Sequence, residues 1–158
     1  VTPIRTFELF VAKTLPTLVM GLLSVFPSLL IVWWFGIPLR GSLLLFLGLT
    51  AVFLLSAIAI GVLIASVSRS LQQALLLAFF GLFPLMFLSG TLAPIESMPK
   101  ALQIASLASP LRHYMDVTLG IFLKGAGIRE LWPSALALIA IGAPLFLVAL
   151  RIFRKRGT

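Results

Sequence analysis

The chain has 158 residues, of which 61% are hydrophobic and 10% charged, and its mean hydropathy is +1.19. Soluble domains are usually about 45–50% apolar and about 25% charged, so this composition excludes an ordinary soluble globular protein. The lack of cysteine excludes disulfides and thiolate metal sites. A formal net charge of +8 would suggest nucleic acid in a soluble protein. Here the basic residues flank apolar runs, as topology-setting loops do, and we expect no nucleic-acid partner.

Three long windows of the chain lack ionisable side chains. They cover positions 14–68, apart from Arg40, and positions 70–94 and 131–150. A membrane-spanning helix needs about 20 mostly apolar residues, and a charge within the bilayer is kept only for a function. We therefore predict an all-α, polytopic membrane bundle in one transmembrane domain over residues 1–158. Its four spans are expected at residues 15–35, 43–67, 74–90 and 131–150.

An amphipathic helix is predicted over residues 2–13, before the first span. It opens with Thr-Pro, a good helix start, and Ile4, Phe7 and Val11 share one stripe. About twelve residues cannot cross a bilayer, so we expect this helix to lie along the membrane surface.

The second predicted span has a face of small residues. Ala57, Gly61 and Ala65 recur every four residues, a spacing that lets another helix approach closely. We interpret this face as a helix-packing surface, and a permeation path is the less favoured alternative.

Residues 91–127 differ from the spans because they mix polar and apolar positions. Helix starts at Met98-Pro99 and Ser109-Pro110 predict two short interfacial or re-entrant helices, and a basic tail over 151–158 follows the last span. With four spans, both ends of the chain lie on one side of the membrane. That side carries seven of the twelve Lys and Arg residues, which favours cytoplasmic ends.

No catalytic group, cofactor site or metal site is predicted from the sequence. The single histidine, His113, is interpreted as a surface or interface residue, and no cluster of His, Asp or Glu has metal-ligand spacing. The run at 120–127 superficially resembles a phosphate-binding loop but lacks the Lys-Ser/Thr that such a loop needs. The chain is therefore not expected to be an enzyme or to hydrolyse ATP.

Several segments together resemble the permease of an ABC-2 type exporter, of the bacterial multidrug type. They are TPIRTFELFVAK, the turn GIPLRGS, the span end LSGTLAPIESMPKALQ, the segment SPLRHYMDVTLGIFLKGAG and the basic tail. The resemblance covers essentially the whole chain, and residues 89–127 are its most diagnostic part. Many such permeases have Asn-Pro where this chain has Ser109-Pro110, and serine also caps helices.

The resemblance implies that the chain forms part of the membrane path and that a partner subunit binds ATP. Complete permeases of this kind typically have six spans, so this chain would be the C-terminal part with the last four. Two permease copies, identical or related, would pair in the bilayer, and each would dock a cytoplasmic ATP-binding subunit that holds ATP and magnesium. Residues 2–13 match the coupling helix, with Arg5, Glu8, Leu9 and Lys13 as candidate ATPase contacts. Residues 91–127 match the short outer helices on the exit side, with Pro94, Glu96, Pro99, Pro110, Arg112 and Asp116.

The predicted function is the membrane subunit of an ATP-driven exporter in a bacterial inner membrane, with its C-terminus in the cytoplasm. A hydrophobic or amphipathic cargo is expected, and its identity stays open. The alternative is an ion-coupled carrier or a membrane-embedded enzyme without an ATPase. A carrier would be expected to have a buried ionisable residue or interrupted helices near the midplane. An enzyme would have to use the group around His113.

Overall fold

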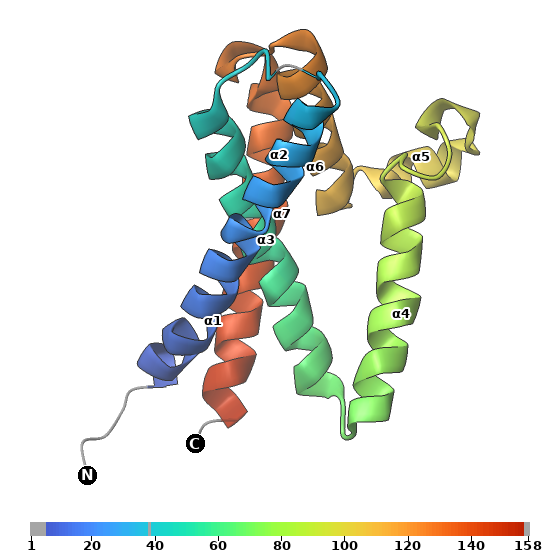
Figure 1. Ribbon diagram of the computed structural model, residues 1–158. Helices are drawn as coiled ribbons and strands as arrows, with labels where there is room; N and C mark the ends of the chain where they lie inside the picture. The colour runs from blue at the N-terminus through green and yellow to red at the C-terminus, as the bar shows by residue number, and fades with distance from the viewer. Residues whose placement is uncertain (1–5, 38, 157–158) are drawn as a thin grey trace.

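The computed structural model describes residues 6–37 and 39–156, and all regular elements in this part of the chain are helices (Figure 1). The start of the first helix, α1, and the end of the last helix, α7, lie at one end of the bundle, as does the α3–α4 link, while α5 and α6 lie towards the other end. In chain order the elements are α1 Thr6–Leu23, α2 Val25–Trp34, α3 Leu43–Val67, α4 Leu71–Leu88, the 3-10 helix η1 Ile95–Ser97, α5 Lys100–Ser106, α6 Pro110–Leu119, the π-helix η2 Gly120–Lys124 and α7 Ile128–Arg156.

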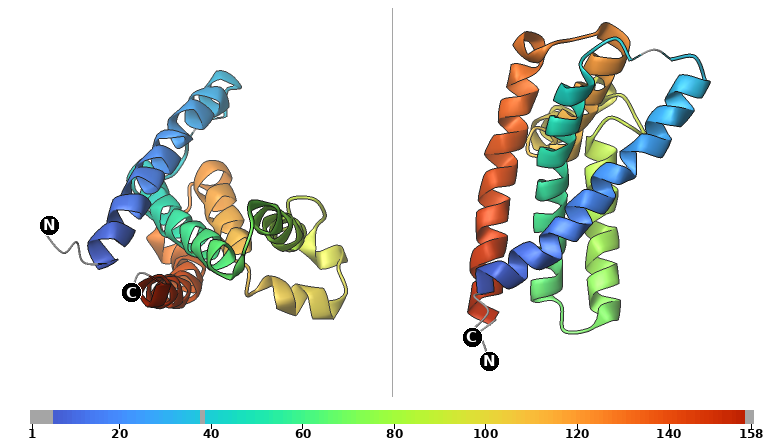
Figure 2. Two further views of the ribbon diagram at one scale, coloured as in Figure 1. Left: turned by 90° about the horizontal axis from the view of Figure 1, so that it is seen from below. Right: turned by 60° about the vertical axis from the view of Figure 1, so that its left-hand side comes forward.

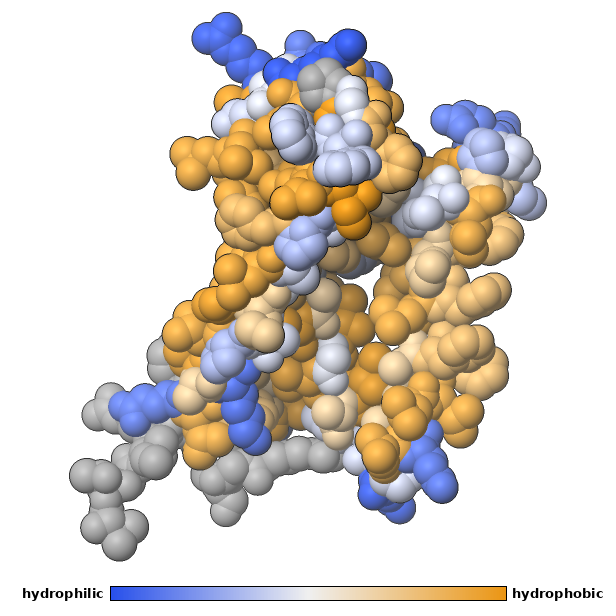
Figure 3. Space-filling view, in the orientation of Figure 1, coloured by the Kyte–Doolittle hydropathy of each residue, from blue (hydrophilic) through white to orange (hydrophobic). Residues whose placement is uncertain are grey.

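Four helical segments are long and apolar enough to cross a membrane, which confirms the predicted all-helical class and number of spans. They are Glu8–Trp34, Leu43–Val67, Leu71–Leu88 and Ile128–Phe153. Figure 3 shows the expected surface, with apolar side chains around the middle and hydrophilic ones gathered at the two ends. This distribution is typical of a protein whose middle is solvated by lipid.

The first span differs from the prediction at its start. We expected a separate surface helix that ends at Lys13, but α1 continues through this point, and the Thr17 hydroxyl donates to the Lys13 carbonyl at 3.1 Å. No helix breaker stands between positions 13 and 15, and Pro16 is accommodated within α1. The described part of the expected amphipathic helix therefore forms the first turns of the span, and residues 2–5 lie outside the described residues.

The helix is instead interrupted at Ser24, between α1 and α2. Pro27 follows three positions later, and its missing N–H removes the helical hydrogen bond that the Leu23 carbonyl would accept. The Ser24 side chain makes no cap bond to α2 and donates to the Gly21 carbonyl at 2.7 Å. The two halves of this span cross the other helices on a diagonal (Figure 2).

The third span begins earlier than predicted, at Leu71 rather than at position 74. The Ser70 hydroxyl accepts the Gln73 amide at 3.2 Å, and the Gln73 side chain accepts the Arg69 amide at 2.9 Å. The first bond caps the helix at Ser70, and the second holds the residue before the cap, so together they fix the helix start. The last helix, α7, also exceeds its predicted bounds of 131–150, since it runs from Ile128 into the basic tail.

The core lies between α3, α6 and α7. Phe46 and Leu49 of α3 pack there with Val117 of α6 and Leu138 of α7. The α4 helix has no buried residue and stands apart from this group along most of its length (Figure 1).

Candidate functional site

The predicted coupling residues lie on the first turns of α1, at the end of the bundle where α7 finishes. Glu8, Leu9 and Lys13 are all exposed, and 41% of the Leu9 surface is accessible. Arg5 lies outside the described residues. The structure therefore places three of the four predicted residues on an accessible surface.

A buried aromatic contact ties this end of α1 to α7. The side chain of Phe10 is 2% exposed, and its ring meets those of Phe146 and Phe153 edge to face, with both centroid distances 5.3 Å. Among the described side chains of α1, only Phe10 and Thr14 are buried. Phe10 thus joins the turn that carries Glu8 to α7 through a buried contact.

The short helices at the opposite end are joined by side chains that bond to backbone carbonyls. Pro94 and Pro99 precede η1 and α5, and Pro110 is the first residue of α6. The Gln103 side chain donates to the carbonyls of Glu96, at 3.4 Å, and Met98, at 2.8 Å, so that it connects α5 to η1.

Arg112 connects α6 back to α5. Its Nη1 donates to the Gln103 carbonyl at 3.1 Å and to the Ser106 hydroxyl. Loss of water around the carboxyl raises the pKa of Asp116 above its ordinary value, and the charge of Arg112 offsets part of that rise. The six predicted exit-side residues therefore fall within one set of linked short helices.

At two positions in this region the structure departs in part from the prediction. His113 is 9% exposed rather than a surface residue, and its Nε2 lies 2.8 Å from the Leu107 carbonyl. Because a carbonyl only accepts, Nε2 carries the proton, and the ring fastens the α5–α6 turn. Ser109 precedes α6 as expected, but its hydroxyl makes no cap bond and is buried without a partner among the described residues.

The small-residue face of α3 makes no helix contact in the described part of the chain. Ala57, Gly61 and Ala65 are exposed, and a Cβ added at Gly61 would meet no atom within 4 Å. The close approach to α7 is made on another face of α3, where a Cβ at Gly142 would collide with the Ser56 hydroxyl. Packing of the predicted face against a helix stays a prediction for an element outside this chain.

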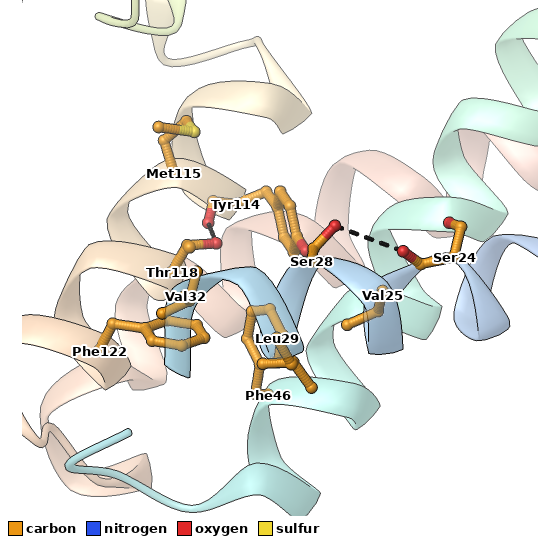
Figure 4. A pocket seen from close by; sticks show the side chains of 10 residues that line it. All are labelled: Ser24, Val25, Ser28, Leu29, Val32, Phe46, Tyr114, Met115, Thr118 and Phe122. Atoms are coloured by element: carbon orange, nitrogen blue, oxygen red, sulfur yellow. Dashed lines mark hydrogen bonds between the residues drawn. The ribbon is translucent and has the colours of Figure 1, made fainter. Parts of the chain in front are cut away.

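A cavity of about 270 Å³, which sequence reasoning missed, lies between α2, α3 and α6 (Figure 4). Two serines one turn apart on the first span face it, and the ring of Phe46 closes one wall. In the sequence, only the pair Ser24 and Ser28 within an apolar run hinted at this cavity. The residues that face this pair across the cavity lie about 90 positions later in the chain, so the sequence pattern could not bring them together. The lining side chains are Ser24, Val25, Ser28, Leu29, Val32, Phe46, Tyr114, Met115, Thr118 and Phe122.

Four apolar helices, polar ends and a linked set of short helices at one end define a polytopic α-helical membrane protein. Residues 1–123 match the family model described as ABC-2 type transporter. The chain belongs to the ABC-2 type transporter family.

Similar curated proteins include permeases from Escherichia coli (strain K12). The chain is 34% identical over 157 residues to the probable multidrug ABC transporter permease YbhR, covering 99% of this chain and 43% of that protein. It is 38% identical over 159 residues to the inner membrane transport permease YhhJ, with coverages of 98% and 42%. A more distant relative is ABC transporter G family member 20 of Dictyostelium discoideum, 28% identical over 140 residues, with coverages of 87% and 19%. The chain therefore spans less than half the length of these relatives. No solved structure matches it.

Proposed function

We propose that this chain is part of the membrane permease subunit of an ATP-driven exporter that moves a hydrophobic or amphipathic substrate out of the cytoplasm. Family membership carries this proposal, together with the naming of two relatives as multidrug or inner membrane transport permeases. ATP would be hydrolysed by a separate ABC ATP-binding subunit, since neither the sequence nor the described residues provide a phosphate-binding loop.

The proposed point of contact with that subunit is the exposed start of α1. Glu8 is the best candidate, because an acidic side chain gains nothing from an anionic lipid surface, whereas Lys13 could equally anchor the helix among headgroups. A push on this turn would reach α7 through Phe10 and its contacts with Phe146 and Phe153. The proposed site also includes Arg5, and a second permease copy would complete the transport path.

The test compares Glu8→Lys and Glu8→Gln with wild type in the full-length permease, reconstituted with its ATPase. Loss of one partner of a desolvated charge pair at an interface costs about 2–5 kcal/mol of binding, whereas substitution of an exposed side chain away from the core usually changes the free energy of unfolding by less than about 0.5 kcal/mol. We expect normal expression and loss of substrate-stimulated ATP hydrolysis in Glu8→Lys. Glu130→Lys is the matched control, because Glu130 also lies in the first turn of its helix but at the other end of the bundle.

Wild-type coupling in both Glu8 variants would remove Glu8 from the mechanism. Failure of any ATP-binding protein to co-purify with the full-length chain would remove the exporter proposal and favour the carrier or enzyme alternative.

The proposal also fixes the orientation in a bacterial inner membrane, with the ends of this chain in the cytoplasm. Cysteines introduced singly at Ser42, Ser97 and Gln72 in a cysteine-free background report this orientation, since the chain has no cysteine of its own. A membrane-impermeant thiol reagent applied to intact cells should label Ser42→Cys and Ser97→Cys but not Gln72→Cys. The reverse labelling would overturn the orientation.

A further inference from the structure

The cavity between α2, α3 and α6 has hydroxyl groups within an apolar and aromatic wall. Hydroxyls of Ser24 and Ser28 come from the first span, and those of Tyr114 and Thr118 from α6 (Figure 4). The Phe46 ring forms part of the wall and meets the Phe122 ring edge to face at a centroid distance of 5.1 Å. Among the described residues, no charged side chain lines the cavity.

The hydroxyl protons around this cavity are already used within the protein. Ser24 donates to the Gly21 carbonyl at 2.7 Å, and Ser28 donates to the Ser24 carbonyl at 3.3 Å. Thr118 donates to the carbonyl of Tyr114 at 2.8 Å. Each hydroxyl has one proton and two lone pairs, so these three oxygens keep only acceptor capacity.

The Tyr114 hydroxyl is committed in the same way. Its oxygen lies 3.1 Å from the Thr50 hydroxyl, and Thr50 itself donates to the Phe46 carbonyl at 2.7 Å. Because the Thr50 proton is taken, Tyr114 must be the donor between the two hydroxyls. Its ring is held in place by a parallel stack on Phe53, with centroids 4.3 Å apart.

The cavity therefore offers acceptors to a ligand and no spare donor. A ligand that brought only acceptors would find no hydrogen bond unless a protein hydroxyl gave up its own, which is costly where water is absent. A charged ligand would lose its hydration without meeting an opposite charge. A neutral molecule with a hydroxyl or N–H donor meets neither penalty.

The volume limits the size of the ligand. A cavity of 150 Å³ is enough to bind benzene, so about 270 Å³ suits about two fused rings. Ser24 and Ser28 are exposed, which leaves the cavity accessible from outside the chain.

We propose that this cavity is a binding site for a small neutral amphiphile, a fused-ring apolar body that carries one hydrogen-bond donor. The site does not depend on export, because binding is a property of the residues that line the cavity and needs neither ATP nor a partner. Within the membrane-embedded part of the molecule, the cavity would therefore select ligands that carry a hydrogen-bond donor over ligands that carry only acceptors.

Binding of 2-naphthol tests the proposal, with 2-methoxynaphthalene as the ligand that has the same rings but no donor. Saturable binding is measured by naphthalene fluorescence to the full-length protein in lipid nanodiscs, after subtraction of binding to empty nanodiscs. Loss of one hydrogen bond corresponds to about a threefold to tenfold change in Kd, so 2-naphthol should bind that much more tightly than its methyl ether.

Variants of the acceptors locate the site. The double variant Ser28→Ala/Thr118→Val should bind 2-naphthol threefold to tenfold more weakly and bind the ether as before. Thr17→Val is the matched control, because the Thr17 hydroxyl also donates to its own helix but does not line the cavity. Melting temperatures without ligand show whether each variant is folded.

A change restricted to the double variant supports the site. Equal binding of the two ligands to wild type would overturn the proposal and indicate a crevice for lipid chains. Donor preference that survives when Ser24→Ala and Tyr114→Phe are added to the folded double variant would place the binding elsewhere in the protein, and would equally overturn the proposal.

Discussion

Replacement of Phe10 by alanine should separate the start of α1 from α7. The side chain is 2% exposed and makes two edge-to-face contacts, with Phe146 and Phe153. Truncation of a buried phenylalanine to alanine costs about 3–5 kcal/mol in protein cores. The lower figure already corresponds to a change of more than a hundredfold in the folded-to-unfolded ratio. Thr14 alone cannot replace this contact, since it is the only other buried residue among the described side chains of α1.

The assay is thermal unfolding of the detergent-solubilised full-length protein, followed by fluorescence-detected size exclusion. Phe10→Ala should lower the melting temperature clearly, and Phe10→Leu should lower it less because most of the apolar volume remains. Phe26→Ala is the control, since the Phe26 side chain is 51% exposed on α2. If Phe10→Ala and Phe26→Ala melt alike, the contact with α7 does not hold α1 in place and the reasoning is refuted.

Two further predictions concern helix packing and the outer helices. Gly142→Ala should lower the melting temperature, because its Cβ would collide with the Ser56 hydroxyl and overpacking costs about 1–3 kcal/mol. Gly61→Ala should be neutral or slightly stabilising, because a Cβ there meets no atom. Equal effects of the two substitutions would contradict this packing. Asp116→Asn should melt at a higher temperature than wild type at neutral pH, and this difference should shrink as the pH falls towards 4. Burial raises the pKa of the Asp116 carboxyl in the folded protein. The proton on this carboxyl therefore stabilises the folded wild type below the unfolded pKa, and this stabilisation is lost as the pH rises through the folded pKa. If the difference in melting temperature between Asp116→Asn and wild type grew as the pH fell, the raised pKa of Asp116 would be contradicted.

Composition was sufficient to locate the spans because a membrane helix needs only length and a lack of charge. The second span was predicted at 43–67 and α3 occupies Leu43–Val67. The packing face of the same helix could not be derived this way. Both sides of α3 are apolar, so the spacing of Ala57, Gly61 and Ala65 does not reveal which side meets α7, and the chain uses Ser56 against Gly142 instead.

The cavity and the position of the helix break depend on contacts between distant residues. The break at Ser24 depends on the effect of Pro27 on the preceding turn, whereas the sequence analysis predicted a helix end at Lys13 from the amphipathic pattern of residues 2–13. The serines of the first span acquire a shared environment with Tyr114 only when α6 packs beside α2 and α3. Local patterns contain no information on that juxtaposition.

The isolation of α4 has a consequence for measurements on this protein. None of its 18 residues is buried, and short connections at each end attach it to α3 and to the outer helices. Much of the free energy that sets its tilt therefore comes from whatever solvates it. Distances from α4 to α6, measured by paired spin labels, should shift between detergent micelles and bilayers of different thickness, while distances from α3 to α7 stay constant.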